Sequence, residues 1–160
     1  MLADRFDPIS GLLDRRSAIA TAERLTRELG MGDETPLAVL WIDLDRFLQV
    51  NQSFGHEGGD AMIFEMAARL RRIAGADARL GRMGGDEFIC ITVGSDEGTS
   101  LMLAETLLTA IAEPVHLGGI TLYPSASIGV ALYDGEEDAL NLLQRADRAM
   151  IAAKRLGGSN

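Results

Sequence analysis

The sequence is poor in cysteine: its 160 residues include only one, Cys90. A disulfide framework within the chain is therefore excluded. Cys90 lies in the apolar run FICITV, which predicts a buried thiol that packs as a small hydrophobic side chain rather than a nucleophile or a metal ligand. This cysteine usage is typical of a reducing compartment, so we expect a cytoplasmic location.

Long apolar runs are also missing. The longest aliphatic stretch, from Leu37 to Ile42, is far shorter than the roughly 20 residues that cross a bilayer. The chain also opens without the basic, apolar and small-residue regions of a signal peptide. We therefore expect no membrane-spanning segment and no direct membrane contact.

Basic residues are scarce relative to acidic ones. Lysine and arginine together number 15 against 24 aspartates and glutamates, and the formal net charge is −9. The field of the whole chain therefore does not attract nucleic acid, which we do not expect as a partner. A ligand that carries phosphates needs a local positive site.

The composition is otherwise that of a folded domain. Hydrophobic residues make up 47% and charged residues 24% of the chain, and no low-complexity tract is present. At this length a single hydrophobic core can form without metal or disulfide support. We expect one domain over residues 1–160, excised from a larger protein.

Periodicity predicts the secondary structure. Helices are predicted over Arg15–Leu29 with a stop at Gly30 and Gly32, over Gly58–Ala74, from the cap at Ser95 and Asp96 to Glu113, and over Asp138–Leu156. Strands are predicted over 37–43 in the centre of the sheet, over 78–83 and 88–93 as a hairpin, and within 115–133. The order lacks strict β-α alternation, which favours an α+β fold with a mainly antiparallel central sheet flanked by helices.

Two acidic pairs stand where this fold has turns or strand ends. Asp43 and Asp45 end the central strand, and alternate residues point to one face, so both carboxylates can serve a hard cation such as Mg²⁺ or simply solvate a loop. Asp86 and Glu87 follow two glycines at the hairpin turn, where the glycines serve either the turn itself or the close approach of a ligand. Together the pairs are compatible with a palm-like metal site.

A glycine-rich segment, FGHEGGD at 54–60, is predicted as a loop that leads into a helix. Free backbone N–H groups at such a helix start can receive anions, although plain turns have the same composition. His56 is equally consistent with a surface or capping role, and Asp60 with a favourable acid in the first helical turn.

Five collinear blocks together resemble the GGDEF family of bacterial diguanylate cyclases over almost the whole chain. The blocks are DPISGLLDRR at 7–16, IDLDRFLQVNQSFGHEGGD at 42–60, the signature RMGGDEF at 82–88, SIGVA at 127–131 and RADRAMIAAK at 145–154. The resemblance implies a palm-like nucleotide cyclase fold that joins two GTP molecules into cyclic di-GMP.

Carried over residue by residue, the resemblance implies a magnesium site and a catalytic pair. Asp43, the backbone carbonyl of Leu44 and Asp86 would bind Mg²⁺. Asp86 would also act as the base, with Glu87 as its catalytic neighbour.

The resemblance also implies the contacts to GTP. The Asn51 amide and the Asp60 carboxylate would hydrogen-bond guanine, because these groups complement its donors and its acceptor. The other implied contacts are His56 beside the nucleotide, backbone N–H groups around Arg46, Phe47 and Leu48 on the phosphates, and the Lys154 ammonium on the same phosphates.

Each domain of this family binds one GTP, so the resemblance implies a homodimer with the active site at its interface. The reaction is nucleotidyl transfer from one GTP to the 3′-hydroxyl of the other, carried out twice. The implied partners are GTP, cyclic di-GMP as product, and a sensor or phosphodiesterase domain in the full-length protein.

The sequence departs from the family pattern at four positions that bear on activity. Leu48 replaces a lysine that helps to stabilise the transition state, and Gly158 replaces an arginine that reaches the phosphates. Gly75 and Ala78 replace the Arg-x-x-Asp pair of the inhibitory product site. The first two losses leave open an alternative, a GTP-binding domain that regulates an attached phosphodiesterase, and a purely structural dimerisation domain is a third reading.

Overall fold

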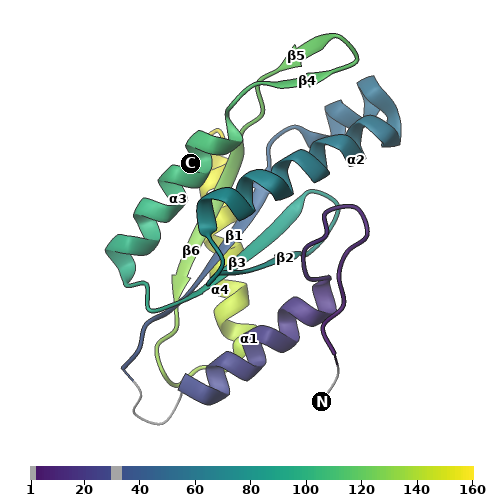
Figure 1. The fold of residues 1–160 in the computed structure, drawn as a ribbon. Coiled ribbons are helices and arrows are strands. Elements are labelled where there is room, and N and C mark those ends of the chain that lie inside the picture. Colours follow the sequence, from purple (N-terminus) through teal and green to yellow (C-terminus); the bar gives the residue numbers. More distant parts are fainter. Residues whose placement is uncertain (1–2, 30–33) are drawn as a thin grey trace.

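A four-stranded antiparallel sheet forms the centre of the structure, a computed structural model that describes residues 3–29 and 34–160 (Figure 1). The strand order is β2-β3-β1-β6, and a separate hairpin of β4 and β5 projects beyond the sheet. The elements are α1 (Arg15–Leu29), β1 (Leu37–Leu44), α2 (Phe47–Ala74), β2 (Arg79–Arg82), β3 (Glu87–Val93), α3 (Glu97–Ile111), β4 (Val115–Leu117), β5 (Ile120–Leu122), β6 (Ala126–Leu132) and α4 (Ala139–Arg155). The predicted α+β class and the central position of β1 are confirmed.

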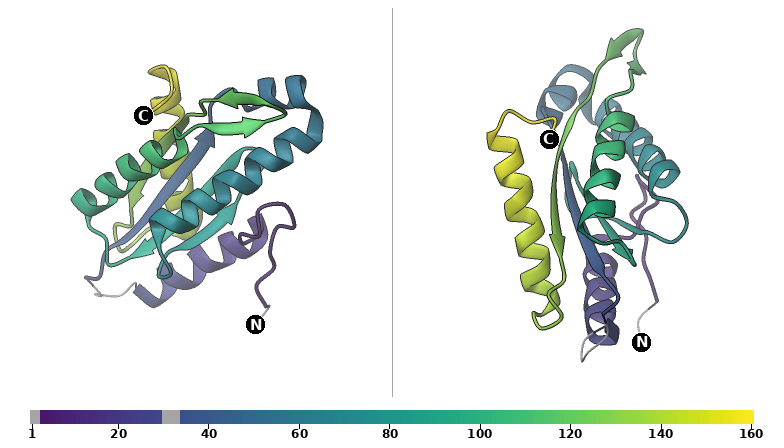
Figure 2. Two further views of the ribbon diagram at one scale, coloured as in Figure 1. Left: turned by 45° about the horizontal axis from the view of Figure 1, so that its top comes forward. Right: turned by 90° about the vertical axis from the view of Figure 1, so that its left-hand side faces the viewer.

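Helices cover the sheet on both faces. Leu40 and Ile42 of β1 pack into the core formed with α2 and α3, whereas the alternating Val39 and Trp41 pack into the core formed with α1 and α4. The right-hand view of Figure 2 shows α4 on one side of the sheet and α2 with α3 on the other. Because both faces are buried, the strand is a continuous apolar run in the sequence.

Helix α4 approaches the sheet most closely at Gly129 of β6. A Cβ atom on Gly129 would lie 2.1 Å from the Met150 amide nitrogen and 2.2 Å from the Ala146 carbonyl oxygen. No side chain fits between the two elements, so glycine sets the depth to which α4 settles on the sheet. That depth also places Lys154, which lies in the last turn of α4.

Helix α2 differs most from the sequence prediction, because it begins at Phe47 rather than at Gly58. Residues 54–60, predicted as a loop, are helical except at Gly55, which has φ 72° and ψ −176°. This φ is rare for residues with a side chain, so Gly55 breaks the helix and lets two helical segments meet at an angle. The loop prediction is wrong because the glycines that disfavour an isolated helix here serve close packing between the two segments.

Helix α3 ends at Ile111, short of the predicted end at Glu113. The buried Arg69 of α2 reaches this end and donates hydrogen bonds to the carbonyl oxygens of Ala110 at 3.1 Å, Ile111 at 2.9 Å and Glu113 at 2.6 Å. These bonds satisfy carbonyl groups that the helix leaves unpaired at its end. A long-range contact therefore fixes this boundary.

The other helices follow the prediction. Helix α1 has the predicted bounds, and α4 lies within the predicted 138–156 with Asp138 as its N-cap. The predicted stop of α1 at Gly30 and Gly32 lies outside the described residues. Cys90 is buried, and burial raises the pKa of its thiol to about 12, as expected for an inert side chain. None of the helices in residues 3–29 and 34–160 is long and apolar enough to cross a membrane.

Candidate active site

The two predicted acidic pairs meet where β1 ends against the hairpin turn. In the sheet register Asp43 pairs with Glu87, and the Leu44 amide donates a hydrogen bond of 3.0 Å to the Asp86 carbonyl oxygen. Asp43 therefore lies beside the Gly84–Gly85–Asp86 turn, although the strand and the turn are far apart in the sequence. The turn itself is closed by a bond of 2.8 Å from the Met83 amide to the Glu87 carbonyl oxygen.

Asp86 and Glu87 lie in an acidic environment. Burial, and next the nearby charge of Asp43, raise the pKa of Asp86 above its ordinary value. Burial also raises the pKa of Glu87, and the charge of Asp43 adds to the effect, although a 3.1 Å hydrogen bond from the Trp41 indole partly opposes it. These carboxylates therefore lie where an added cation is stabilised.

Arg82 holds the signature turn in place, a role that the sequence interpretation missed. Its guanidinium donates to the carbonyl oxygens of Gly84 at 3.1 Å and Gly85 at 2.8 Å, and it forms an ion pair with Asp7 at 3.2 Å. Burial alone would raise the pKa of Asp7, but hydrogen bonds from Ser10 and Arg82 lower it overall. Both residues stand in blocks that carry the family resemblance, and only their contact was hidden.

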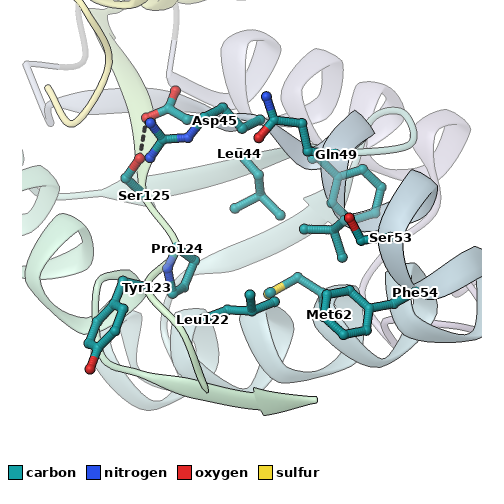
Figure 3. Close-up of a pocket in the computed structure, with 13 residues that line it drawn as sticks. Leu44, Asp45, Gln49, Ser53, Phe54, Met62, Leu122, Tyr123, Pro124 and Ser125 are labelled. Atoms are coloured by element: carbon teal, nitrogen blue, oxygen red, sulfur yellow. Dashed lines mark hydrogen bonds between the residues drawn. The ribbon is translucent and has the colours of Figure 1, made fainter. Parts of the chain in front are cut away.

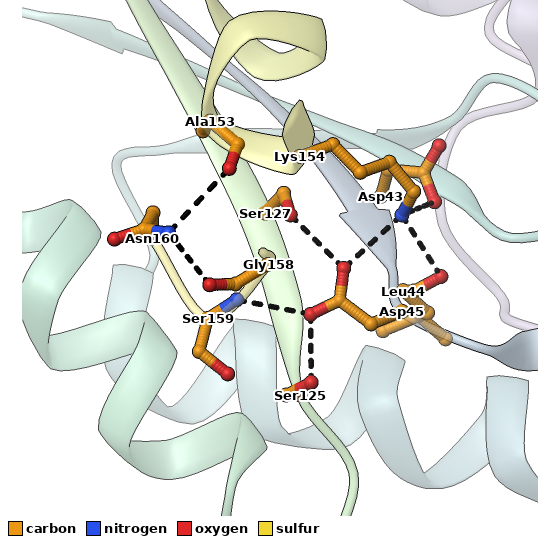
Figure 4. Close-up of polar contacts among 10 residues, drawn as sticks. All are labelled: Asp43, Leu44, Asp45, Ser125, Ser127, Ala153, Lys154, Gly158, Ser159 and Asn160. Atoms are coloured by element: carbon orange, nitrogen blue, oxygen red, sulfur yellow. Dashed lines mark hydrogen bonds and ion pairs between the residues drawn. The ribbon is translucent and has the colours of Figure 1, made fainter. Parts of the chain in front are cut away.

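Lys154 reaches the same strand end from α4 (Figure 4). Its Nζ donates to Asp43 Oδ1 at 2.9 Å and to Asp45 Oδ1 at 3.1 Å, and lies 3.5 Å from the Leu44 carbonyl oxygen. Burial alone would lower the pKa of Lys154, but the bonds to Asp43 and Asp45 raise it overall, so the ammonium stays charged. Lys154 thus brings a positive charge to this edge, where it pairs with Asp43 and Asp45.

Asp45 serves a different purpose from Asp43. The hydroxyl groups of Ser125 and Ser127 donate to its two carboxylate oxygens at 2.6 Å and 2.9 Å, and the Ser159 amide donates at 3.0 Å (Figure 4). Burial alone would raise the pKa of Asp45, but these bonds and the bond from Lys154 lower it overall. Because its oxygens are already used, Asp45 does not offer a free carboxylate beside Asp43.

The oxygen atoms at this edge fit magnesium. Across residues 3–29 and 34–160, no group of three or more His, Cys, Asp or Glu side chains is arranged as a complete metal cage. Mg²⁺ does not need one, because proteins commonly hold it by one or two carboxylates while water and substrate phosphates complete its shell. Asp43, the Leu44 carbonyl and Asp86 are such a partial set, and the Lys154 ammonium already lies against two of its members.

The first turn of α2 presents free backbone N–H groups beside this edge. Its N-cap, Arg46, has a left-handed conformation with φ 57°, and no side chain caps the helix start. The amide groups of Phe47 and Leu48 therefore have no side-chain cap, and amide groups at such a helix start can receive an anion. The Leu48 side chain is 67% exposed and adds no charge.

The predicted guanine contacts lie on either side of the break at Gly55. Asn51 belongs to the first helical segment and packs against Gly59 of the second, where a Cβ atom would lie 1.9 Å from Asn51 Oδ1. Asp60 follows Gly59 directly and is exposed, as is His56. The bend in α2 therefore brings Asn51 against Gly59, the residue before Asp60.

A pocket of about 200 Å³ opens between the start of α2 and the segment that joins β5 to β6 (Figure 3). Of the residues predicted to bind substrate, Phe47 lines this pocket, whereas Asn51, His56 and Asp60 do not. The carboxylate on its wall belongs to Asp45, whose oxygens are occupied. The two residues predicted to bind guanine, Asn51 and Asp60, therefore lie outside the lining of this pocket.

Gly158, where the family pattern has an arginine, lies against Asp45. It has φ 78°, and a Cβ atom there would lie 2.5 Å from Asp45 Oδ2. A side chain at this position would disturb the Asp45 network unless the C-terminal segment moved. The sequence does not show this constraint, because Gly158 and Asp45 are far apart in the chain.

The chain is similar to known proteins over almost its whole length. Residues 4–160 match the family described as diguanylate cyclase, GGDEF domain. The diguanylate cyclase DgcP of Escherichia coli is 33% identical over 154 residues, 93% of this chain and 44% of that protein. The bifunctional diguanylate cyclase/cyclic di-GMP phosphodiesterase MucR of Pseudomonas aeruginosa is 38% identical over 126 residues, 78% of this chain and 18% of that protein.

The chain thus spans less than half the length of these curated relatives. Among solved structures, a sensory box/GGDEF family protein from Caulobacter crescentus superposes with a TM-score of 0.87 at 35% identity, covering 95% of this chain and 99% of that one. The match extends over both acidic pairs, the bent helix and the final lysine, so the chain belongs to the GGDEF family of diguanylate cyclase domains.

Proposed function

We propose that this domain condenses two GTP molecules into cyclic di-GMP with release of two pyrophosphates. The convergence of Asp43, the Leu44 carbonyl and the Asp86 turn at one edge, with the Lys154 ammonium against them, is the observation that carries this proposal. Hard oxygen donors beside a lysine and a free helix start suit a magnesium–nucleotide complex.

In this proposal Asp86 accepts the proton of the attacking 3′-hydroxyl. A carboxylate placed within hydrogen-bond reach of the hydroxyl can take its proton in the transition state as a general base. Lys154 and the amide groups of Phe47 and Leu48 stabilise charge on the phosphates. Asn51 and Asp60 select guanine.

Magnesium would be held by Asp43, the Leu44 carbonyl and Asp86, and when bound it lowers the pKa of the attacking hydroxyl and neutralises charge on the transferred phosphoryl group. Asp43 and Asp86 would approach each other with less repulsion in that state, since the charge that raises the pKa of Asp86 would be compensated.

Each domain presents one such set of residues, so turnover requires two domains that face each other. The 3′-hydroxyl bound to one domain then meets the α-phosphate bound to its partner. We propose that a homodimer is the active form and that a sensor or phosphodiesterase domain outside this chain controls its assembly.

A second candidate is a GTP-binding regulatory domain with little turnover. The exposed, uncharged Leu48 and the glycine at 158 favour it, because each removes a positive charge that would stabilise the transition state. Losing one preorganised donor costs about 10²-fold in rate, so both losses together leave binding possible and chemistry slow.

A forced dimer separates these two candidates. The wild-type domain fused to a dimeric coiled coil should form cyclic di-GMP from GTP and Mg²⁺, and Leu48→Lys should raise the rate by about tenfold or more because it restores a donor at the phosphates. Product is measured by chromatography. Gln52→Lys, which adds the same charge one turn further along α2, is the matched control and should change the rate little.

The outcomes of this assay are distinct. If the wild type forms no cyclic di-GMP and the Leu48→Lys variant does, the regulatory domain is favoured over the cyclase. A Leu48→Lys dimer that binds GTP and Mg²⁺ yet forms no product would remove the support for Asp43 and Asp86 as catalytic groups. Gly158→Arg is a poorer test, because its side chain would collide with Asp45.

We also predict that the product does not bind at the segment before the signature. Gly75, at the end of α2, and Ala78, just before β2, supply neither the guanidinium nor the carboxylate that would hold cyclic di-GMP. Calorimetry should show no saturable binding of cyclic di-GMP at this segment. Product seen at this segment in crystals of the wild-type domain would show the assignment of these two positions to be wrong.

A further inference from the structure

Lys154 is the only lysine in the sequence, and its ammonium lies at the proposed magnesium site. Its Nζ is 2.9 Å from Asp43 Oδ1 and 3.5 Å from the Leu44 carbonyl oxygen, two of the three proposed metal ligands (Figure 4). A cation that contacts the ligands of a second cation competes with it, because the two positive charges repel each other at such short range.

We propose that Lys154 is the counter-cation of the metal-free site and that a divalent ion must displace it from Asp43. This inference rests on the proposed function, since it takes Asp43 and Leu44 as metal ligands. In the metal-free domain the ammonium offsets the repulsion among the carboxylates of Asp43, Asp86 and Glu87. The negative charge of Asp43 acts on both of the other two, and that of Asp86 acts on Glu87. Asp147 of α4 adds to the acidic field around Glu87, and Arg82 opposes it at Asp86.

Asp45 holds the Lys154 ammonium near the metal site during this exchange, so Asp45 is a positioning residue. It accepts a bond of 3.1 Å from Lys154 and is itself fixed by Ser125, Ser127 and the Ser159 amide. The ammonium therefore retains one ion pair after it leaves Asp43. From Asp45 it can turn toward phosphates that arrive with the metal.

Displacement of Lys154 by the metal predicts a different effect on metal affinity from that of a lysine that only contacts phosphates. Without nucleotide, loss of the ammonium should strengthen binding of a bare divalent ion by about tenfold, because a part-buried ion pair no longer competes. With nucleotide, the same loss should weaken binding of the metal–GTP complex. A lysine that acts only on phosphates would leave the affinity for the bare ion unchanged.

The first experiment is a titration of the nucleotide-free domain with Mn²⁺, a paramagnetic substitute for Mg²⁺, with free Mn²⁺ measured by electron paramagnetic resonance. Lys154→Met is compared with the wild type and with Arg155→Met, which removes one positive charge from the next, exposed position of α4. Lys154→Met should bind Mn²⁺ about tenfold more tightly, and Arg155→Met less than twofold more tightly. Adding Asp43→Asn to Lys154→Met should remove the gain.

The failures are distinguishable. If Lys154→Met binds Mn²⁺ no better than Arg155→Met while Asp43→Asn still weakens binding, the displacement is overturned and the proposed metal site stands. If Asp43→Asn changes Mn²⁺ binding in neither background, the metal site of the proposed function is itself wrong.

A second measurement needs no variant at Lys154. Lysine labelled with ¹⁵N at the side-chain nitrogen gives a single ammonium signal, because the chain has one lysine. Addition of Mg²⁺ to the nucleotide-free wild-type domain should shift this signal along a saturable curve, and Asp43→Asn should remove that shift. A signal that stays in place while Mg²⁺ binds would overturn the proposal.

Discussion

Replacing Asp86 with asparagine should lower cyclic di-GMP formation by the dimerised domain by about 10³-fold or more. The amide cannot accept the proton of the 3′-hydroxyl and is a weaker ligand for Mg²⁺, so base and metal functions are lost together. The initial rate of product formation at saturating GTP measures the effect. Asp77→Asn, which neutralises an exposed acid before the same hairpin, is the matched control and should leave the rate within twofold.

The same variant should be more stable than the wild type in the absence of metal at neutral pH. Burial and the charge of Asp43 raise the pKa of Asp86 above the ordinary 3.8, so the folded state binds this proton more tightly than the unfolded state does. Stability from this group is therefore present below pH 3.8 and is lost as the pH rises through the raised value. Thermal unfolding should show the gain of Asp86→Asn above that window and no gain in acid.

The two measurements on Asp86→Asn can fail separately. A variant that loses activity but also unfolds at neutral pH would show that the acid is structural rather than functional. A folded variant that keeps more than a tenth of the wild-type rate would show that another group acts as the base.

Guanine selectivity is the second large effect that we expect. GTP with Mg²⁺ should bind at least about 10²-fold more tightly than ATP with Mg²⁺, because adenine presents an amino group where guanine presents a carbonyl and lacks the donors that Asp60 accepts. Isothermal calorimetry on the wild-type domain measures both affinities. Asp60→Ala should weaken GTP by tenfold or more and leave ATP nearly unchanged.

The controls for this prediction come from the same helix. Asp60 is exposed, so its removal should not alter the melting temperature, and Glu57→Ala removes a neighbouring exposed acid without touching the proposed base contacts. Equal affinities for GTP and ATP in the wild type would refute the assignment of Asn51 and Asp60. Equal losses in Glu57→Ala and Asp60→Ala would show that the effect of Asp60→Ala is not specific to recognition of the base.

Much of the fold follows from local patterns in the sequence. The bounds of α1, the buried strand β1 and the hairpin around the signature were predicted because periodicity and turn chemistry act over a few residues. The first half of α2 was not predicted, because the glycines at 55, 58 and 59 disfavour an isolated helix. These glycines are explained by packing, because the side chains of Phe54 and Asn51 occupy the space that a Cβ atom on Gly58 or Gly59 would need.

For the site, the sequence by itself determined which residue types are present and in what order, and the resemblance gave them roles. It could not show that Lys154 lies on Asp43, 111 residues away, or that Arg82 joins Asp7 to the signature turn. Nor could it separate Asp43, which accepts a hydrogen bond from Lys154, from Asp45, whose oxygens also accept from Ser125, Ser127 and Ser159. Tertiary structure decided these points, because a carboxylate's chemistry depends on which donors the fold brings to it. Those donors come from β6, the residue before it, the end of α4 and the C-terminal segment.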